Sequence, residues 1–410
     1  MTTLRTMKIP ITKSLLGEEE ENAVLEVLRS GWLVQGPKVA AFERMVAHYV
    51  GARHAVATSS CTTALHLALT LAGIGPGDDV LVPSFTFIAT ANAVHYTGAT
   101  PVFVDIHPRT YNIDPDRLEA AITPRTKAIM PVHQIGLAAD MDRINTIAHR
   151  HGLIVIEDAA PAIGATYKGR AVGGLGNPTC LSFHPRKVIT TGEGGLLLTN
   201  DDALADRARA LRAHAMSVSD LARHHSDRVI LEEYREVGYN YRLTDLQAAI
   251  GIEQMKKLDF VLARRKEVAA RYNEAFADLD GVQLPFSSSD TPHTYQSYMI
   301  QLHPDAPTTR DDVMREMLEA GVATRRGVMA THREPCYRRR YPHLTLPVTE
   351  GAARSTLLLP IYTTITHTEQ EHVIEHLRKV LRGKRAQTTV RPPDPTLRSL
   401  QSPSPQTRRV

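Results

Sequence analysis

The chain has 410 residues, of which 42% are hydrophobic and 22% are charged, a length and composition that suit a large globular domain joined to a smaller one. No apolar stretch is long enough to span a bilayer, and the first residues lack the apolar core of a signal peptide. The only cysteines are Cys61, Cys180 and Cys336, so we expect a reducing cytoplasm, with neither a disulfide framework nor a zinc site.

The net charge of +4 is concentrated at the end of the chain. Residues 381–410 contain seven Arg or Lys and one Asp, so they carry +6 and the rest of the chain carries −2. Because the remainder is not basic, no nucleic-acid partner is expected. The tail at 383–410 is rich in Pro, Ser, Thr and Gln, and we expect it to be disordered and dispensable for both folding and turnover.

The first half of the chain begins with two helices, predicted near 18–30 and 38–50 on either side of a turn at 31–37. Strands then alternate with helices. The strands are predicted at 55–58, 79–83, 101–105, 128–132 and 153–158, and the helices at about 63–73, 88–96, 115–121 and 140–151. This alternation, with nearly continuous apolar strands, predicts an α/β domain whose mostly parallel sheet is covered by helices on both faces.

The second half becomes more helical. Strands at 179–183 and 196–199 precede a helix at 201–214, a His-rich segment at 217–226 that we expect to be mobile, and a long helical stretch at 243–279 with a break. A loop at 281–292, a strand at 295–302 and helices at 309–320 and 369–381 follow. The predicted division is an N-terminal arm with a large domain at 1–255, a small C-terminal α+β domain at 256–382 and the tail.

The stretch from Ser182 to Gly195 is the strongest functional signal. It places Lys187 in a turn between two apolar strands, followed by two threonines and a Gly-x-Gly-Gly run. Glycines let backbone or a flat ligand approach closely, and a buried lysine can act as an amine nucleophile. A solvated surface lysine is the alternative interpretation, but the flanking strands, turn and glycines favour a functional one.

Other polar and aromatic residues lie at strand ends, where ligands bind open parallel sheets. Residues 59–63 offer hydroxyls and a helix N-terminus for a phosphate, or form a simple N-cap. Asp158 leaves a buried strand beside two alanines, so we expect a cationic partner, with a helix N-cap or a metal ligand as alternatives. Phe85 and Phe87 could join the core or support a planar ring, and 238–242 could bind a ligand or only cap the long helix.

Together these features supply a lysine for an imine, a carboxylate for a pyridinium, hydroxyls for a phosphate and an aromatic face. Pyridoxal 5′-phosphate (PLP) requires this combination. The chain resembles the DegT/StrS-type sugar aminotransferases, which are PLP enzymes of fold type I in the aspartate aminotransferase superfamily. The matching stretches run from Gly31 to Pro360, and residues 182–195 resemble the lysine motif of the family closely. The resemblance implies a large PLP-binding domain with a mostly parallel sheet of the seven-stranded type.

The resemblance also implies roles for individual residues. Lys187 would form the internal aldimine and then carry the proton, Asp158 would pair with the pyridine nitrogen, and Phe87 would stack on the ring. Asn240 would reach the phosphate of the partner subunit, since the sites of the family lie at a homodimer interface. The implied cofactor-binding set is Lys187, Asp158, Ser182, Thr62, Cys61, Phe87 and Asn240.

The sequence departs from the family pattern at three places. Pro161 stands where many members carry a Gln whose amide contacts the ring hydroxyl, and proline has no such donor. Cys61 stands where glycine is common. The stretch that holds Arg325, Arg326 and His332 replaces a His-Tyr pattern. These three residues are the candidate substrate-binding residues, and the adjacent arginines favour an anionic acceptor or the carboxylate of the donor.

The implied activity is transfer of an amino group, with glutamate as the expected donor, to a keto group of a nucleotide-linked sugar or related cyclic ketone by a ping-pong mechanism. A PLP-dependent sugar dehydratase and a non-catalytic PLP-binding regulator are the alternatives. Family dehydratases carry His at the position of Lys187, which argues against the first alternative. A regulator need not retain Lys187, Asp158 and Ser182 together, which argues against the second.

Overall fold

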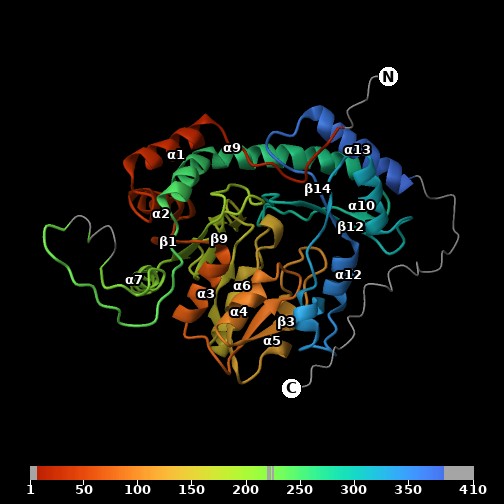
Figure 1. Ribbon diagram of the computed structural model, residues 1–410. Coiled ribbons are helices and arrows are strands. Elements are labelled where there is room, and N and C mark those ends of the chain that lie inside the picture. The colour runs from red at the N-terminus through yellow and green to blue at the C-terminus, as the bar shows by residue number, and fades with distance from the viewer. Residues whose placement is uncertain (1–6, 219–222, 224–225, 383–410) are drawn as a thin grey trace, which may run out of the picture.

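The computed structural model describes residues 7–218, 223 and 226–382. The tail predicted at 383–410 and part of the His-rich segment at 217–226 lie outside them. Figure 1 shows a sheet with helices around it and a smaller C-terminal region, with the long helix α9 (Asp245–Phe276) running along both. The predicted α/β class is confirmed.

The N-terminal helices α1 (Glu18–Ser30) and α2 (Pro37–Val50) both pack against α9. Helix α1 has the predicted bounds and ends at Gly31, whose φ of 73° is left-handed. Asp245 accepts hydrogen bonds from the N–H groups of Gly36, Lys38 and Val39 at 2.8, 3.1 and 2.9 Å. A carboxylate at the N-terminus of α2 complements the helix dipole, so this contact fixes α2 on the start of α9.

Two four-stranded sheets form the large region. One has the order β3-β2-β4-β5 and is parallel throughout, from β2 (Asp79–Pro83), β3 (Thr100–Val104), β4 (Thr126–Ile129) and β5 (Ile154–Val155). The other has the order β1-β10-β9-β6, from β1 (His54–Thr58), β6 (Glu157–Asp158), β9 (Thr179–Ser182) and β10 (Gly195–Thr199). Strand β10 runs antiparallel to both neighbours, and the loop at 183–194, rather than a crossover helix, joins it to β9.

Helices cover both faces of these sheets. They are α3 (Cys61–Leu71), α4 (Ala89–Tyr96), α5 (Pro115–Ala121), α6 (Met141–His151) and α7 (Asp202–Leu211). Strand β2 shows the consequence, because Leu81 belongs to one hydrophobic cluster whereas Val80 and Val82 belong to another. Burial of alternate residues on opposite faces accounts for the continuous apolar strands in the sequence.

Helix α9 is continuous over 32 residues, so the predicted break is wrong. It contains no proline, and its Gly251 does not interrupt it, because the absent side chain makes room for Phe42 of α2. A Cβ atom at Gly251 would lie 2.7 Å from the Phe42 ring. The predicted domain boundary at 255/256 falls inside this helix, and the division stays a prediction.

The smaller region holds an antiparallel sheet of order β11-β12-β14-β13, formed by β11 (Val282–Gln283), β12 (Tyr298–Leu302), β13 (Arg325–Arg326) and β14 (Thr356–Leu359). Helices α10 (Arg310–Glu319), α11 (Pro335–Arg338), α12 (Pro347–Ser355) and α13 (His367–Arg382) accompany it. Strand β11 lies inside the segment predicted as a loop. Strands β13 and β14, helices α11 and α12, and the hairpin of β7 (Thr166–Tyr167) and β8 (Arg170–Ala171) were not predicted.

No helix in the described part of the chain has the length and apolar character needed to cross a membrane. The cytoplasmic location stays a prediction.

Candidate active site

Lys187 lies in the loop between β9 and β10. The loop is closed at its base, where Phe183 donates to the Gly194 carbonyl at 2.9 Å. The Phe183 carbonyl accepts from the Thr190 hydroxyl at 2.8 Å and from the Thr191 N–H at 3.0 Å. The two threonines of the motif therefore hold the loop in shape and place the lysine on a braced turn.

The Lys187 side chain is partly buried, and its Nζ has no hydrogen-bond partner among the described residues. Burial lowers the pKa of Lys187 below its ordinary value of 10.5; Cys61 and Asp158 oppose this shift, and the charge of Arg186 adds to it. A solvated surface lysine would not behave in this way. The arrangement favours the neutral amine that can attack an aldehyde.

Asp158 ends β6 and is only 4% exposed. Its Oδ2 accepts from the Thr90 hydroxyl at 2.7 Å, and its Oδ1 accepts from the Ala160 N–H at 3.1 Å. Burial raises the pKa of Asp158 above 3.8, and the two hydrogen bonds and the charges of Lys187 and His133 oppose the rise. The expected cationic side-chain partner is absent, since no ion pair to Asp158 is formed within the described residues. A buried carboxylate without a paired cation fits the nitrogen of a pyridinium ring.

The predicted phosphate loop lies where β1 runs into α3. Ser60 is the N-cap of α3 and forms a capping box with Thr63, so the N-cap interpretation is correct. Cys61 and Thr62 follow in the first turn, and their N–H groups have no acceptor in the described part of the chain. The N-cap therefore leaves free donors at the positive end of α3, as an anion site requires.

Strand register brings Ser182 to the same place. Ser182 of β9 pairs with Gly195 of β10, which pairs in turn with Thr58 at the end of β1. A side chain on Gly195 would collide with the backbone of Ser60 and Cys61. The glycine therefore lets the lysine motif approach the N-terminus of α3, and the residues present fit a cofactor phosphate.

Phe85 and Phe87 lie in different environments. Phe85 is fully buried in a hydrophobic cluster with Tyr111, whereas Phe87 is 64% exposed. The core interpretation is thus correct for Phe85. An exposed aromatic ring just before α4 is free to support a planar ligand, as predicted for Phe87.

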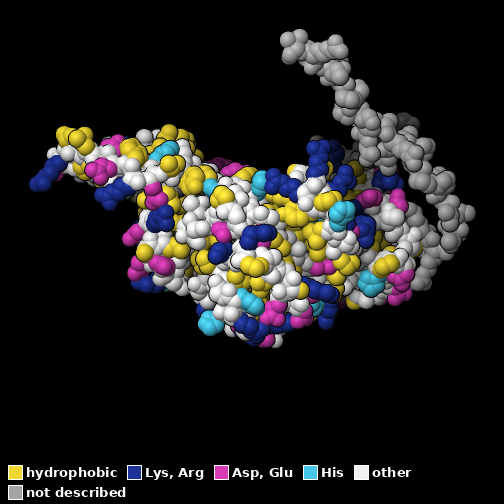
Figure 2. Space-filling model, turned by 90° about the horizontal axis from the view of Figure 1, so that it is seen from below, with side chains coloured by type: hydrophobic (Ala, Val, Ile, Leu, Met, Phe, Trp, Pro, Cys, Tyr) yellow, Lys and Arg dark blue, Asp and Glu magenta, His cyan; other side chains and the backbone are white. Residues whose placement is uncertain are grey.

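The segment around Asn240 contacts the loop that precedes α3. Ser59 donates to the Tyr241 carbonyl at 2.8 Å, and the Tyr239 and Tyr241 rings stack at 4.7 Å. Asn240 is exposed and pairs through its backbone with Ala213. The preceding segment at 226–237 projects from the body of the molecule (Figures 1 and 2).

The predicted substrate residues lie in different environments. Arg325 and Arg326 are exposed on β13, and Arg325 lies close enough to Arg186 to reinforce the lowering of the Arg186 pKa that burial causes. His332 is fully buried, with its ring nitrogens 2.6 Å from the Ser84 hydroxyl and 3.2 Å from a Glu350 oxygen. Direct contact of His332 with a substrate would require one of these bonds to break.

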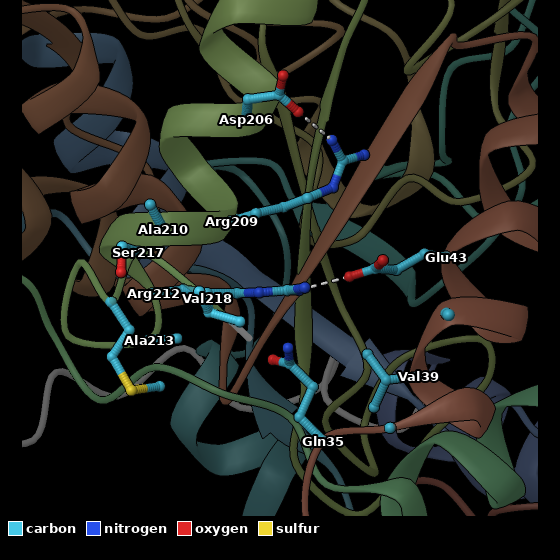
Figure 3. Close-up of a pocket in the computed structure, with 13 residues that line it drawn as sticks. Gln35, Val39, Glu43, Asp206, Arg209, Ala210, Arg212, Ala213, Ser217 and Val218 are labelled. Carbon is cyan, nitrogen blue, oxygen red and sulfur yellow. Dashed lines mark hydrogen bonds and ion pairs between the residues drawn. The ribbon is translucent and has the colours of Figure 1, made fainter. Parts of the chain in front are cut away.

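A cavity of about 410 Å³ lies elsewhere, between α2 and α7, and no predicted site residue lines it (Figure 3). Arg212 and Glu43 form an ion pair along its wall. Glu43 accepts from the Ala57 N–H at 2.7 Å, and Arg212 donates to the Ala57 carbonyl at 2.7 Å. The pair thus covers the open edge of β1 as a neighbouring strand would.

Two residues near the site escaped the sequence-based reasoning. Thr90 donates to Asp158, and Gln296 donates to the Arg186 carbonyl at 2.6 Å, which attaches the small region to the lysine loop. Thr86 and Thr90 lie four residues apart at the start of a helix, a spacing that predicts contact between their hydroxyls and could have drawn attention to Thr90. The contact of Gln296 spans 110 residues, and no local pattern indicates it.

Comparison with known proteins identifies the family. The model of the DegT/DnrJ/EryC1/StrS aminotransferase family matches residues 14–378. The chain belongs to this family. The predicted family, enzyme class and cofactor are therefore confirmed: it is a PLP-dependent aminotransferase.

Individual members of the family are similar over nearly their whole length. The chain is 43% identical over 379 residues to the spore coat polysaccharide biosynthesis protein SpsC of Bacillus subtilis (strain 168), covering 92% of this chain and 97% of that protein. It is 43% identical over 379 residues to GDP-perosamine synthase of Caulobacter vibrioides, covering 91% and 98%. The crystal structure of NtdA from Bacillus subtilis with bound cofactor PMP superposes with a TM-score of 0.78 at 36% identity, covering 89% of this chain and 81% of that one.

Proposed function

We propose that this aminotransferase moves an amino group from glutamate to the keto group of a nucleotide-linked sugar or a related cyclic ketone. The observation that carries the proposal is the cluster of Lys187, Asp158 and the α3 N-terminus, three sites that match the aldehyde, the ring nitrogen and the phosphate of one cofactor. The sugar class is supported by GDP-perosamine synthase, a relative with 43% identity.

When bound, PLP supplies an aldehyde that accepts the amino group and a ring that stabilises negative charge on the neighbouring carbon. Lys187 would hold the aldehyde carbon and, once released, move a proton beside the substrate. Asp158 would hold the ring nitrogen, and Ser182, Thr62 and the N–H groups of α3 would hold the phosphate. Donor and acceptor would use this site in turn, which gives ping-pong kinetics.

The site is proposed to be shared between two subunits of a homodimer. Asn240 is exposed on a segment whose neighbours Val229, Leu231 and Val237 are 92%, 87% and 90% exposed. Exposed apolar side chains on a projecting segment favour burial against a second copy. Asn240 would then complete the phosphate site of the partner.

The acceptor is proposed to carry negative charge. Arg325 on β13 presents a guanidinium group near Arg186, whereas the neighbouring Arg326 is paired with Glu334 at 3.3 Å. Arginine forks bind phosphate and carboxylate oxygens in pairs, so the diphosphate of a nucleotide sugar or the donor carboxylate suits them. His332, which is buried and bonded to Ser84 and Glu350, would support the site rather than face the substrate.

We also propose that β5 and β6, separated only by Ile156, act as one strand and join the two sheets into a seven-stranded platform. Ile156 donates to the Ile129 carbonyl at 3.1 Å, and Asp158 donates to the Pro131 carbonyl at 2.9 Å. These bonds connect the Asp158 strand to its parallel neighbour on one side, while β9 lies on the other. The division into domains at 1–255 and 256–382 remains part of this proposal.

Incubation of the purified protein with PLP, glutamate and a panel of nucleotide ketosugars tests the activity. Formation of an amino sugar, detected by mass, is the expected result. Dehydration of the sugar without amination would favour the dehydratase alternative. Absence of both reactions in a protein that binds PLP would favour the regulatory alternative.

Borohydride reduction of the PLP-loaded protein followed by peptide mapping tests the assignment of Lys187 separately. The pyridoxyl group is expected on the peptide that contains Lys187. Its recovery on another lysine, such as the exposed Lys168, would overturn the assignment without affecting the assay for activity.

A further inference from the structure

A chain of two threonine hydroxyls leads to Asp158. The Thr90 hydroxyl lies 2.7 Å from Oδ2 of Asp158, and the Thr86 hydroxyl lies 2.8 Å from that of Thr90. Thr86 and Thr90 are each 1% exposed, and Asp158 is 4% exposed. Thr331, itself fully buried, donates to the Thr86 carbonyl at 2.9 Å and fixes the outer end of the chain.

The direction of these hydrogen bonds follows from the number of protons. An ionised carboxylate only accepts, so the single hydroxyl proton of Thr90 is used on Asp158. The Thr90 oxygen is then an acceptor, and Thr86 must donate to it. Thr86 thus donates to Thr90, which donates to Oδ2 of Asp158, and such chains strengthen each bond by polarisation.

We propose that Thr90, supported by Thr86, is a positioning residue that keeps Asp158 ionised and thereby keeps the proton on the ring nitrogen of the cofactor. The inference rests on the proposed role of Asp158. If the carboxylate lost its donor it would become more basic, and the proton would move from the ring nitrogen to Asp158. A neutral ring withdraws electrons less strongly, so the reaction would slow.

The surroundings of Asp158 make this donor important. Burial opposes the charge of Asp158, and the charges of Lys187 and His133 partly offset this effect. Asp158 in turn raises the pKa of the neighbouring thiols of Cys61 and Cys180. The only other hydrogen-bond donor to the carboxylate within the described residues is the Ala160 N–H. Removal of the Thr90 hydroxyl would therefore leave Oδ2 without a donor from the described part of the chain.

Two variants test the role of the hydroxyl. Thr90→Val keeps the shape of the side chain and removes the donor, and Thr90→Ser keeps the donor. Thr349→Val is the matched control, because the buried Thr349 hydroxyl donates to a buried carboxylate, that of Asp105, at 2.7 Å. Each variant is loaded with PLP labelled with ¹⁵N in the ring, and melting temperature, PLP affinity and the ¹⁵N chemical shift are measured.

In Thr90→Val the ¹⁵N shift is expected to move toward that of an unprotonated ring, and PLP affinity is expected to fall about tenfold, which is the scale of one charge-assisted hydrogen bond. Thr90→Ser is expected to restore both values, and Thr349→Val to change neither. Thr86→Val is expected to move the shift in the same direction by a smaller amount. An unchanged shift in Thr90→Val would overturn the inference, even if the variant melted at a lower temperature.

Asp158→Asn separates this inference from the assignment on which it rests. A changed ¹⁵N shift in Asp158→Asn with none in Thr90→Val would reject only the role of Thr90. An unchanged shift in Asp158→Asn would show that Asp158 does not hold the ring nitrogen, and would reject both.

Discussion

Burial acts on Lys187 and Asp158 in opposite directions, and both shifts favour the neutral form. It lowers the pKa of the lysine and raises that of the aspartate, while their mutual attraction opposes both shifts. The thiol of Cys61 also has a raised pKa because it is buried near Asp158. The surroundings of both groups are thus unfavourable for charge, and a ligand with a cationic ring nitrogen would relieve this at Asp158.

Asp158→Asn should therefore stabilise the protein without cofactor and weaken cofactor binding. Because the folded-state pKa of Asp158 is raised above 3.8, its contribution to stability is present below that pH and is lost as pH rises through the folded-state value. In thermal melting of the cofactor-free proteins, the melting temperature of the variant relative to the wild type should be higher at pH 8 than at pH 4. PLP titration should show at least about tenfold weaker binding. The same difference in melting temperature between variant and wild type at both pH values would contradict the buried-charge explanation.

Lys187→Arg should fold and bind PLP but lose turnover. A guanidinium stays protonated and forms no imine, and loss of a positioned base costs roughly 10²–10⁴-fold in rate. Turnover and borohydride trapping are the measurements. Lys168→Arg is the control, since Lys168 is exposed and pairs with Asp142 at 2.5 Å. Retained trapping in Lys187→Arg would mean that another lysine carries the cofactor.

At the scale of elements, α9 connects the N-terminal helices, the large sheet and the small sheet. Helix α2 approaches it closely at Gly251, and Arg265 donates to the carbonyls of Tyr295 and Gln296 at 3.1 and 3.2 Å. Gln296 in turn holds the Arg186 carbonyl beside Lys187. The small region is therefore attached to the lysine loop through α9 and through Gln296, which lies just before β12.

Gly251→Ala should destabilise the protein although alanine is the better helix former. The new Cβ would lie 2.7 Å from the buried Phe42 ring, and overpacking costs about 1–3 kcal/mol against a gain of about 1 kcal/mol in helix propensity. Gly351→Ala in α12 is the matched control, because no atom lies within 4 Å of its added Cβ. It should be stabilising by about 0.5–1 kcal/mol. Chemical unfolding of both variants measures these differences, and a stabilised Gly251→Ala would show that α2 can move away.

At the scale of the whole molecule, the described chain carries an exposed aromatic ring and a projecting apolar segment that a single copy leaves uncovered. Phe87 is 64% exposed beside the site, and Val229 and Leu231 are 92% and 87% exposed. Isolated exposed apolar residues are ordinary, but a projecting segment that carries several of them favours an interface.

Mixed subunits should test whether the sites are shared. Lys187→Ala and Asn240→Ala are each expected to be inactive as homodimers. After subunit exchange, half the dimers would contain one intact site, so activity should recover to roughly a quarter of the wild-type value under two-fold symmetry. Exchange is verified by mass or affinity tag. Verified heterodimers without activity would argue that Asn240 serves its own subunit.

Sequence patterns alone predicted most of the elements and named the candidate residues of the site. Regular spacing of apolar residues predicted α1 and β2 with their observed bounds, because each buries one continuous face or run. Lys187 and Asp158 were proposed from their positions at strand ends, and their roles stay predictions. The structure was needed to show that β10 is antiparallel, that α9 is unbroken, and that Thr90 rather than a cation contacts Asp158. These features depend on contacts between distant segments, which leave no periodic pattern in the sequence.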